Sequence, residues 1–453
     1  TQGSDKYLQN NIEVNNKGTI TWEGNNVIDG DKSSKGEVIN NQGIFEIRND
    51  SDLNYLTFNN QGVLIKSDTK GVTTFNGSAF NNTGAVDLYQ GILNFNGGGT
   101  SNGGRFKLAA DTVAQWNDNY ILDADTTFTS KGTVSIGGGK VDFQTEEVNL
   151  TDLNISGGSL NLAGYKIDLS DLEISGGSLN LTGTTNINDD FNLSNKGILN
   201  TTGTINLLGK NNQWSGGTLS GTGIINIDSE SVFKVTQGFD KYLQNNITLN
   251  NLGIITWDGK NEVDGNKGST GEVINNQGIF EIKNDSDFNH LIFINEGSLI
   301  ISETTGITNF SNSTFNNTGK VDLRKGLLNF NNGSFIQAAG AIQEKGGILD
   351  TSKSTFIKDN QSADFNIITA TAPTSVKPGT NISVSWTVEN QGKDAVDAAT
   401  WYDAVYLSSD NKFDVTDIFL TRVPQKLSSL NKNQYTANSN ISLPETAIGN
   451  QYL

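Results

Sequence analysis

The amino-acid sequence predicts an all-β protein, a right-handed parallel β-helix that is followed by a small β-sandwich. Three observations support the β-helix. A twelve-residue stretch, Gly-Glu-Val-Ile-Asn-Asn-Gln-Gly-Ile-Phe-Glu-Ile, occurs twice without a change, at 36–47 and at 271–282. Its last part alternates polar and apolar residues, which is the period of a half-buried strand. Related units recur about every 20 residues along most of the chain, a spacing typical of solenoids.

Each unit consists of a turn rich in Asn and Gly and then a short strand with two apolar residues on one side. The turn residues are those that tolerate positive φ. The cleanest spacing is 19 residues, from Gly139 to Gly158 and from Gly158 to Gly177. One coil cannot bury its apolar side alone, so we expect on the order of 15 to 17 coils that stack around a shared core.

A duplication organises this predicted β-helix, which we place at 1–358. Residues 1–98 and 236–333 align without a gap at a fixed offset of 235, and about two-thirds of the aligned positions are identical. We call these segments the first and second cassettes. Residues 99–235 lie between them and form shorter coils. The pattern indicates growth by copying of several coils at a time.

The repeats also predict which side chains stack. Ile20, Phe45, Leu64, Val86 and their copies are expected to form continuous apolar columns. Asn-Asn pairs are expected at equivalent corners of successive coils, either as hydrogen-bonded ladders or only as residues that tolerate the left-handed conformation. These pairs are Asn40-Asn41, Asn81-Asn82, Asn275-Asn276 and Asn316-Asn317.

Four aromatic residues, Trp22, Phe95, Trp257 and Phe330, are either core residues or exposed platforms for sugars. Their place in the inward register favours the core. Residues 25–35 form a loop that interrupts the coil pattern, so a ligand is expected there more than elsewhere in the β-helix.

Residues 359–453 follow a different pattern. All four prolines lie in the last fifth of the chain, and short alternating strands are expected at 383–388, 401–407, 419–423 and 440–443. Short strands separated by turns with Pro and Gly predict a β-sandwich. The sequence ends in what reads as the start of a further strand, so we expect this domain to be truncated here.

Composition excludes several classes of function. The formal net charge of −18 disfavours nucleic acid as a partner. No apolar run is long enough to insert into a membrane. The chain has no Cys and no Met, which excludes a disulfide framework and a thiol nucleophile. Hydrophobic residues make up 34%, a low value that fits thin coils in which each strand buries one side.

The last segment resembles the CARDB family, a cell-adhesion-related bacterial domain with an immunoglobulin-like (Ig-like) sandwich. The residues that carry the resemblance are 372–379, 384–392 (Val-Ser-Trp-Thr-Val-Glu-Asn-Gln-Gly), 401–410 (Trp-Tyr-Asp-Ala-Val-Tyr-Leu-Ser-Ser-Asp) and 449–453. The preceding region, with Phe-Asn-Asn-Thr-Gly at 80–84 and Gly-Leu-Leu-Asn-Phe at 326–330, is similar to the repeats of filamentous-haemagglutinin-like adhesins. Together these resemblances imply a large exported surface protein.

Candidate catalytic groups are few. His290 is the single histidine, and Tyr55 occupies the matching position of the first cassette. The adjacent acids Glu146-Glu147 and Asp189-Asp190 point to opposite sides of a strand, so they form a catalytic couple only if they lie in a loop. We therefore expect no enzymatic activity, with a polysaccharide-cleaving β-helix as the alternative.

A calcium site is the one metal site that the sequence suggests. Asp410, Asp414 and Asp417 lie in a loop between expected strands and offer hard oxygen ligands suited to Ca²⁺. The alternative interpretation is an acidic turn whose Asp side chains cap the backbone.

The function expected from these observations is a non-enzymatic structural or adhesive rod, located outside the cell on a bacterial surface. Expected partners are cell-surface or matrix glycans or proteins, or neighbouring copies of the chain. A polysaccharide-binding β-helix and a fibre subunit are the alternatives.

Overall fold

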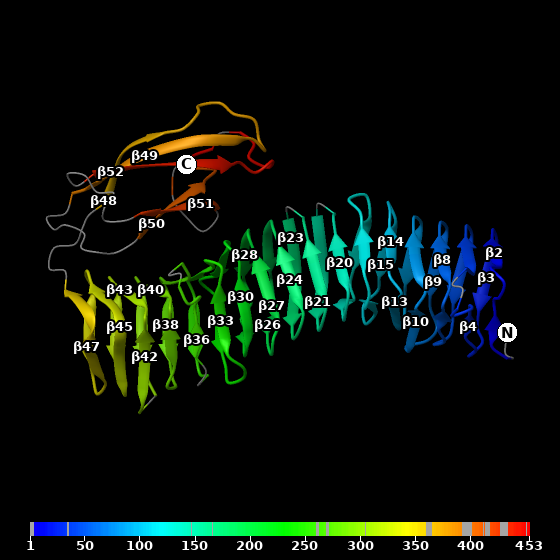
Figure 1. The fold of residues 1–453 in the computed structure, drawn as a ribbon, viewed down its shortest axis with the longest axis horizontal. Coiled ribbons are helices and arrows are strands. Elements are labelled where there is room, and N and C mark those ends of the chain that lie inside the picture. The colour runs from blue at the N-terminus through cyan, green and yellow to red at the C-terminus, as the bar shows by residue number, and fades with distance from the viewer. Residues whose placement is uncertain are drawn as a thin grey trace. The chain divides into compact units, whose positions relative to one another are not determined.

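A computed structural model describes 4–33, 36–145, 147–164, 166–259, 262–268, 271–303, 305–358, 365–391, 401–410, 412, 417–425, 434–449 and 451–453. Every regular element within these ranges is a β-strand. Strands β1 to β47 form a parallel solenoid of about 16 turns, which confirms the predicted β-helix architecture (Figure 1).

Each coil contributes three strand positions, so the solenoid has three faces, here called A, B and C. Face A contains β1 (Lys6–Tyr7), β4 (Ile28–Asp29), β7 (Leu53–Asn54), β10 (Val72–Asn76), β13 (Ile92–Asn96), β16 (Val113–Trp116), β19 (Thr133–Ile136), the second halves of β21 (Glu147–Ile155) and β23 (Lys166–Ile174), β26 (Phe191–Leu193), β29 (Asn212–Trp214), β32 (Val232–Val235), β35 (Ile254–Trp257), β38 (Ile279–Ile282), β41 (Ser298–Ile301), β44 (Lys320–Leu323) and β46 (Ala341–Glu344). Face B contains β2 (Glu13–Asn16), β5 (Val38–Asn41), β8 (Thr57–Asn60), β11 (Ala79–Asn82), β14 (Gly99–Ser101), β17 (Tyr120–Leu122), β20 (Lys140–Phe143), β22 (Ser159–Leu162), β24 (Ser178–Leu181), β27 (Ile198–Thr201), β30 (Gly217–Ser220), β33 (Lys241–Gln244), β36 (Val263–Asp264), β39 (Asp287–Asn289), β42 (Ile307–Ser311) and the first half of β45 (Leu327–Gln337). Face C contains β3 (Thr19–Trp22), β6 (Ile44–Ile47), β9 (Val63–Lys66), β12 (Ala85–Leu88), β15 (Arg105–Leu108), β18 (Thr127–Ser130), the first halves of β21 and β23, β25 (Thr184–Ile187), β28 (Thr204–Leu207), β31 (Ile224–Ile227), β34 (Thr248–Asn251), β37 (Val273–Asn276), β40 (Ile292–Asn295), β43 (Thr314–Asn317) and the second half of β45; β47 (Ile348–Lys358) pairs with β45.

The alternation that predicted these strands is also what fills the core. In β6 the side chains of Phe45 and Ile47 are buried, while those of Ile44 and Glu46 face outward. Phe45 is in register with Ile20 below it and Leu64 above it, so like positions stack from coil to coil. The apolar sides of all three faces therefore meet in one core along the solenoid axis.

The four aromatic residues that the sequence analysis assigned either to the core or to sugar platforms belong to this core. Trp22, Phe95, Trp257 and Phe330 are all buried. Phe95 stacks on Trp116 of the next coil with ring centroids 5.3 Å apart. The core interpretation is confirmed, and these four rings offer no exposed platform to a sugar.

The turn glycines have a different role from the predicted one. Gly43 has no positive φ, but a Cβ atom there would lie 2.0 Å from the carbonyl oxygen of Gly18 in the coil below. A Cβ at Gly62 would meet the oxygen of Gly43 at 2.0 Å. Glycine is thus required at these corners by the close approach of stacked backbones, whereas Gly139, Gly158 and Gly177 do adopt positive φ.

The predicted columns and equivalent corners are confirmed within each cassette. They do not continue from one cassette to the other, because the two cassettes occupy different faces. Strand β5 of the first cassette lies on face B, whereas its copy β37 lies on face C. Likewise Phe45 belongs to the column on face C, and its copy Phe280 stacks between Ile255 and Leu299 on face A. The offset of 235 residues equals a whole number of coils plus one strand, so the second cassette is rotated by one face.

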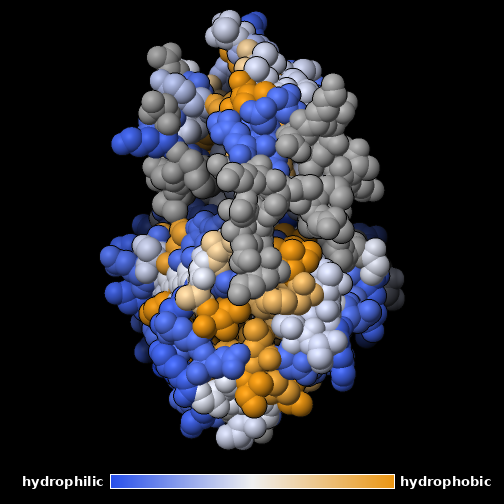
Figure 2. All heavy atoms as spheres, turned by 90° about the vertical axis from the view of Figure 1, so that its left-hand side faces the viewer, coloured by the Kyte–Doolittle hydropathy of each residue, from blue (hydrophilic) through white to orange (hydrophobic). Residues whose placement is uncertain are grey.

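The last coil of the solenoid exposes apolar side chains. Ile348 at the start of β47 is 61% exposed, and hydrophobic residues gather on this end of the solenoid (Figure 2). Among the described strands, none stacks beyond β47, which pairs with β45.

The chain divides into two compact units, and the second contains 316–318, 335–341 and 356–453. In this unit β48 (Phe365–Thr371), β49 (Asn381–Asn390) and β52 (Gln434–Ser442) form one antiparallel sheet, and β50 (Trp401–Leu407) and β51 (Ile418–Gln425) form another. Both sheets contribute to one core around Trp386, Leu407 and Tyr435. This arrangement is compatible with the predicted sandwich, although the sequence analysis missed β48.

Candidate functional site

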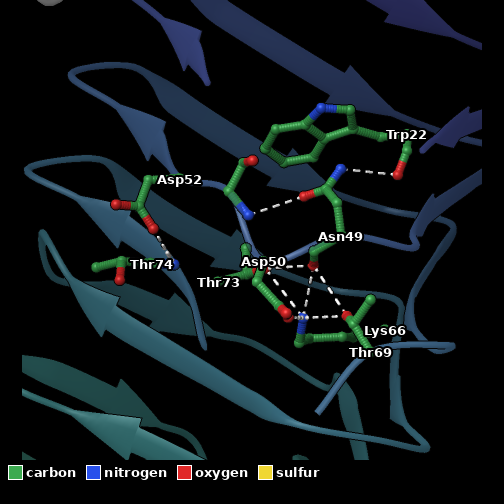
Figure 3. Close-up of polar contacts among 9 residues, drawn as sticks. Trp22, Asn49, Asp50, Asp52, Lys66, Thr69, Thr73 and Thr74 are labelled. Atoms are coloured by element: carbon green, nitrogen blue, oxygen red, sulfur yellow. Dashed lines mark hydrogen bonds and ion pairs between the residues drawn. The ribbon is translucent and has the colours of Figure 1, made fainter. Parts of the chain in front are cut away.

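A buried lysine forms the most concentrated polar cluster of the first cassette (Figure 3). The Lys66 ammonium donates to the carbonyl oxygen of Asn49 at 2.8 Å, to Asp50 Oδ1 at 3.1 Å and to the hydroxyls of Thr69 and Thr73 at 3.3 and 3.1 Å. The Lys66 side chain has no exposed surface, whereas Asp50 is 43% exposed. The cluster is therefore an internal cation with its counter-charge at the surface.

The local sequence explains why a lysine points inward. Lys66 is the fourth residue of β9, and the strand buries its second and fourth residues. The hydroxyls of Thr69 and Thr73 donate to the same Asn49 carbonyl at 3.2 Å. Asn49 lies at the corner of the preceding coil. Its side chain fixes this corner, because Nδ2 donates to the carbonyl of Trp22 at 2.8 Å.

Burial lowers the pKa of the Lys66 ammonium, and the hydrogen bond and charge of Asp50 offset part of that shift. An unpaired ammonium at this depth would be strongly unfavourable, so the ring of oxygen atoms is what permits the lysine. Because no part of the side chain reaches the surface, Lys66 serves the fold and has no access to a substrate.

The second cassette lacks this cluster. The position matching Lys66 is Ile301 and the position matching Thr73 is Thr308. Thr308 is fully buried, and its Oγ1 has no hydrogen-bond partner among the described residues. The sequence signal for the difference was a lysine at an inward position, but only the structure identified its partners.

Two asparagine ladders run along the first cassette. In the buried ladder, Nδ2 of Asn16 donates to Oδ1 of Asn41 at 2.7 Å, Asn41 donates to Asn60 at 2.8 Å, and Asn60 donates to Asn82 at 2.8 Å. The same amides also donate to backbone carbonyls, as Asn41 does to Val63 at 3.0 Å. The ladder interpretation is confirmed for Asn40-Asn41 and Asn81-Asn82, and the left-handed alternative is wrong there, since none of the four has positive φ.

The outer ladder runs in the opposite direction. Asn40 donates to Asn15 at 2.9 Å, Asn59 donates to Asn40 at 2.9 Å, and Asn81 donates to Asn59 at 3.0 Å. Each outer amide thus donates toward the N-terminal coil, whereas each inner amide donates toward the C-terminal coil. A longer outer ladder on face C joins Asp168, Asn186, Asn206, Asn226 and Asn250.

Of the two adjacent acid pairs, one lies wholly within the described residues. Asp189-Asp190 lies in the connection between β25 and β26, which is the loop setting in which adjacent acids can cooperate. Their backbone groups are used in coil stacking, because Asp189 N–H donates to Ser170 at 2.9 Å and Leu172 N–H donates to the Asp190 carbonyl at 2.9 Å. Glu146 lies outside the described residues.

His290 lies at a corner with φ of 56°, and its counterpart Tyr55 has φ of 54°. The imidazole Nδ1 is 3.6 Å from Asp264 Oδ1. This distance is too long for a hydrogen bond. Within the described part of the chain, no three His, Asp or Glu residues are placed to hold a metal ion.

The predicted calcium ligands are only partly described. Asp410 Oδ1 accepts a hydrogen bond from the backbone N–H of Lys412 at 2.7 Å, an arrangement that the capped-turn alternative also predicts. Asp417 immediately precedes β51. Asp414 lies outside the described residues, so the calcium site stays a prediction.

A carboxylate links the two sheets of the C-terminal unit. Asp403 on β50 accepts hydrogen bonds from Trp386 Nε1 at 2.7 Å, Gln425 Nε2 at 3.1 Å and the Tyr435 hydroxyl at 2.6 Å. Trp386 and Tyr435 belong to the other sheet. Burial, and then the hydrogen bond to Asp403, raise the pKa of Tyr435 well above its usual range. Asp403, the last residue of the Trp-Tyr-Asp run at 401–403, thus has a structural role, because it joins the two sheets.

Comparison of the chain with profiles of protein families, with curated proteins and with solved structures gave no significant match. No helix among the described residues is long and apolar enough to cross a membrane. The class that the fold defines is a β-solenoid repeat protein.

Proposed function

We propose that the chain is a non-enzymatic structural or adhesive rod of a large bacterial surface protein, acting outside the cell. The observation that supports this proposal most is the stack of about 16 coils, whose interior is filled by side chains and tied by amide ladders. A solenoid of this kind presents long faces to partners. Surface or matrix glycans, surface proteins, or further copies of the chain are the partners that suit such faces.

Binding and turnover assays test this proposal together. Beads coated with the purified chain should adhere to cells or to immobilised matrix glycans more than beads coated with albumin. The same glycans incubated with the chain should keep their length on sizing gels. Reproducible shortening of a glycan would refute the proposed non-enzymatic rod and support the alternative, a polysaccharide-cleaving enzyme.

The calcium site at Asp410, Asp414 and Asp417 is proposed as a structural feature of the C-terminal unit. Calcium should raise the melting temperature of the chain, and a chelator should lower it. The variant Asp410→Asn/Asp417→Asn should lose the response. An unchanged melting temperature with calcium and with chelator would refute the calcium site and support the alternative interpretation, an acidic turn whose Asp side chains cap the backbone.

A further inference from the structure

Three cations surround one buried carboxylate near the end of face A. The Asp322 side chain is only 1% exposed, and its Oδ2 lies 3.5 Å from Lys320 Nζ, 3.3 Å from Arg324 Nη2 and 3.2 Å from Lys345 Nζ. The three cationic side chains themselves remain 43%, 48% and 53% exposed. Lys325, next in sequence to Arg324, is exposed as well. We call Lys320, Arg324, Lys325 and Lys345 the basic corner.

The matching site of the first cassette has one buried aspartate but fewer cations around it. Asp87 matches Asp322, and it is paired with one cation, Arg105, through two hydrogen bonds of 2.9 and 3.1 Å. The residues that match Lys320, Arg324 and Lys325 are Ala85, Tyr89 and Gln90. The backbone and the aspartate are thus the same in both copies, and three cations are specific to the second.

Neutralising Asp322 does not require three cations. A single guanidinium satisfies Asp87, and the extra cations repel one another when no further anion is present. Among the described residues, Lys320, Arg324 and Lys345 form ion pairs with no acid other than Asp322. Glu303 pairs instead with Lys283 at 3.8 Å. Partly exposed cations that share one carboxylate leave donors free to bind an external anion.

We propose that the basic corner binds an acidic polysaccharide through the carboxylate or sulfate groups of the polymer. The inference rests on the proposed adhesive function, because it names a chemical class of partner for it. The net charge of −18 does not oppose such a contact at physiological salt, where charges farther away than about 8 Å are largely screened.

A localised corner suits a polysaccharide better than nucleic acid. Nucleic-acid sites form an extended basic stripe that follows many phosphates, whereas the basic corner has four cations close together. The positions of the cations also fit a chain lying across the coils, because β44 and β46 bring Lys320 and Lys345 from successive coils to one place.

The experiment compares two triple variants of the full chain. Lys320→Ala/Arg324→Tyr/Lys325→Gln gives the second cassette the residues of the first. Lys107→Gln/Lys140→Gln/Lys166→Gln removes three exposed cations elsewhere on the solenoid and is the matched control. Chondroitin sulfate and polygalacturonate oligomers are the probes, with duplex DNA as competitor, at 25 and 150 mM salt.

The expected result is salt-sensitive binding that weakens at least tenfold in the first variant and less than twofold in the control, while both keep their circular dichroism spectrum. Equal binding by the two variants, no binding at 25 mM salt, or tighter binding to DNA than to either probe would overturn the inference. If the unmodified chain bound neither probe while beads coated with it still adhered to cells, the basic corner alone would be refuted and the proposed rod would remain.

Discussion

Lys66 Nζ lies 3.1 Å from Asp50 Oδ1, with the ammonium inside the solenoid and the Asp50 side chain 43% exposed. The second cassette keeps an aspartate, Asp285, at the matching position, but it has Ile301 in place of the lysine. The same interior position of the repeated pattern is thus filled by a charged side chain in the first cassette and by an apolar side chain in the second. Comparison of matched substitutions in the two cassettes can measure what each side chain contributes.

Thr73→Val and Thr308→Val form one such matched pair. Thr73 accepts from Lys66 and donates to Asn49, so its loss should lower the free energy of unfolding by about 1–3 kcal/mol. Thr308 Oγ1 has no hydrogen-bond partner in the described part of the chain, so Thr308→Val should leave stability unchanged or raise it by up to about 1 kcal/mol. Denaturant unfolding measures both; equal losses would contradict the assigned hydrogen bonds.

Lys66→Ile and Lys66→Ala separate charge from packing. The isoleucine copies the residue of the second cassette and should change stability by less than about 1.5 kcal/mol, since buried ion pairs are often replaceable by apolar residues of similar size. The alanine also leaves a cavity and should cost about 2–4 kcal/mol. If the two variants were equally unstable, the ion pair itself, rather than the filled volume, would control this position.

The asparagine ladders predict unequal effects of neighbouring residues. Asn41→Ala removes a buried amide and takes one buried hydrogen bond from each of Asn16, Asn60 and the Val63 carbonyl, so we expect a loss of about 2–4 kcal/mol. Asn40→Ala removes an outer amide whose partners water can reach, and the expected loss is under about 1 kcal/mol. Urea midpoints of the two variants decide the matter, and reversed order would refute the distinction between ladders.

Lys241 predicts a dependence of stability on pH. Burial lowers the pKa of this ammonium to about 8, and the charge of Asp240 offsets only part of the shift. Between about pH 8 and the ordinary lysine pKa, the unfolded chain binds more protons than the folded chain, so stability rises with pH, by up to about 1.4 kcal/mol per pH unit. Above about pH 10 buried Tyr120, whose pKa burial raises, acts in the opposite direction.

The measurement is urea unfolding at half-unit steps from pH 7 to pH 10. Lys241→Met should flatten the rise, and Lys6→Met, at the exposed matching position of the first cassette, should not. A rise of the same slope in Lys241→Met would assign it to other groups.

Asp403 is expected to control the stability of the C-terminal unit. Asp403→Ala leaves the Trp386, Gln425 and Tyr435 donors without their shared acceptor and should cost about 3–5 kcal/mol, whereas Asp403→Asn keeps one acceptor oxygen and should cost less. Scanning calorimetry should show a lower transition for this unit, with the solenoid transition unchanged. A simultaneous shift of every transition would indicate that the effect is not local.

Much of the fold was accessible from short-range patterns. The period of two in Ile44–Ile47 fixed which side chains enter the core, and the 19-residue spacing of Gly139, Gly158 and Gly177 fixed the length of a coil. Both are local properties, because inward and outward positions alternate along any strand. The candidate sites were less accessible: the partners of Lys66 are 3 to 17 residues away and come from different coils.

The sequence by itself determined that the chain forms stacked coils, which residues fill them, and that one cassette is a copy of the other. Only the tertiary structure decided on which face each copy lies, in which direction each ladder donates, and how many cations meet at Asp322. The physical reason is that the face on which a strand lies depends on how many strand positions precede it in the chain. The offset of 235 residues contains one strand position more than a whole number of coils, so an identical sequence lies on a different face in the second cassette.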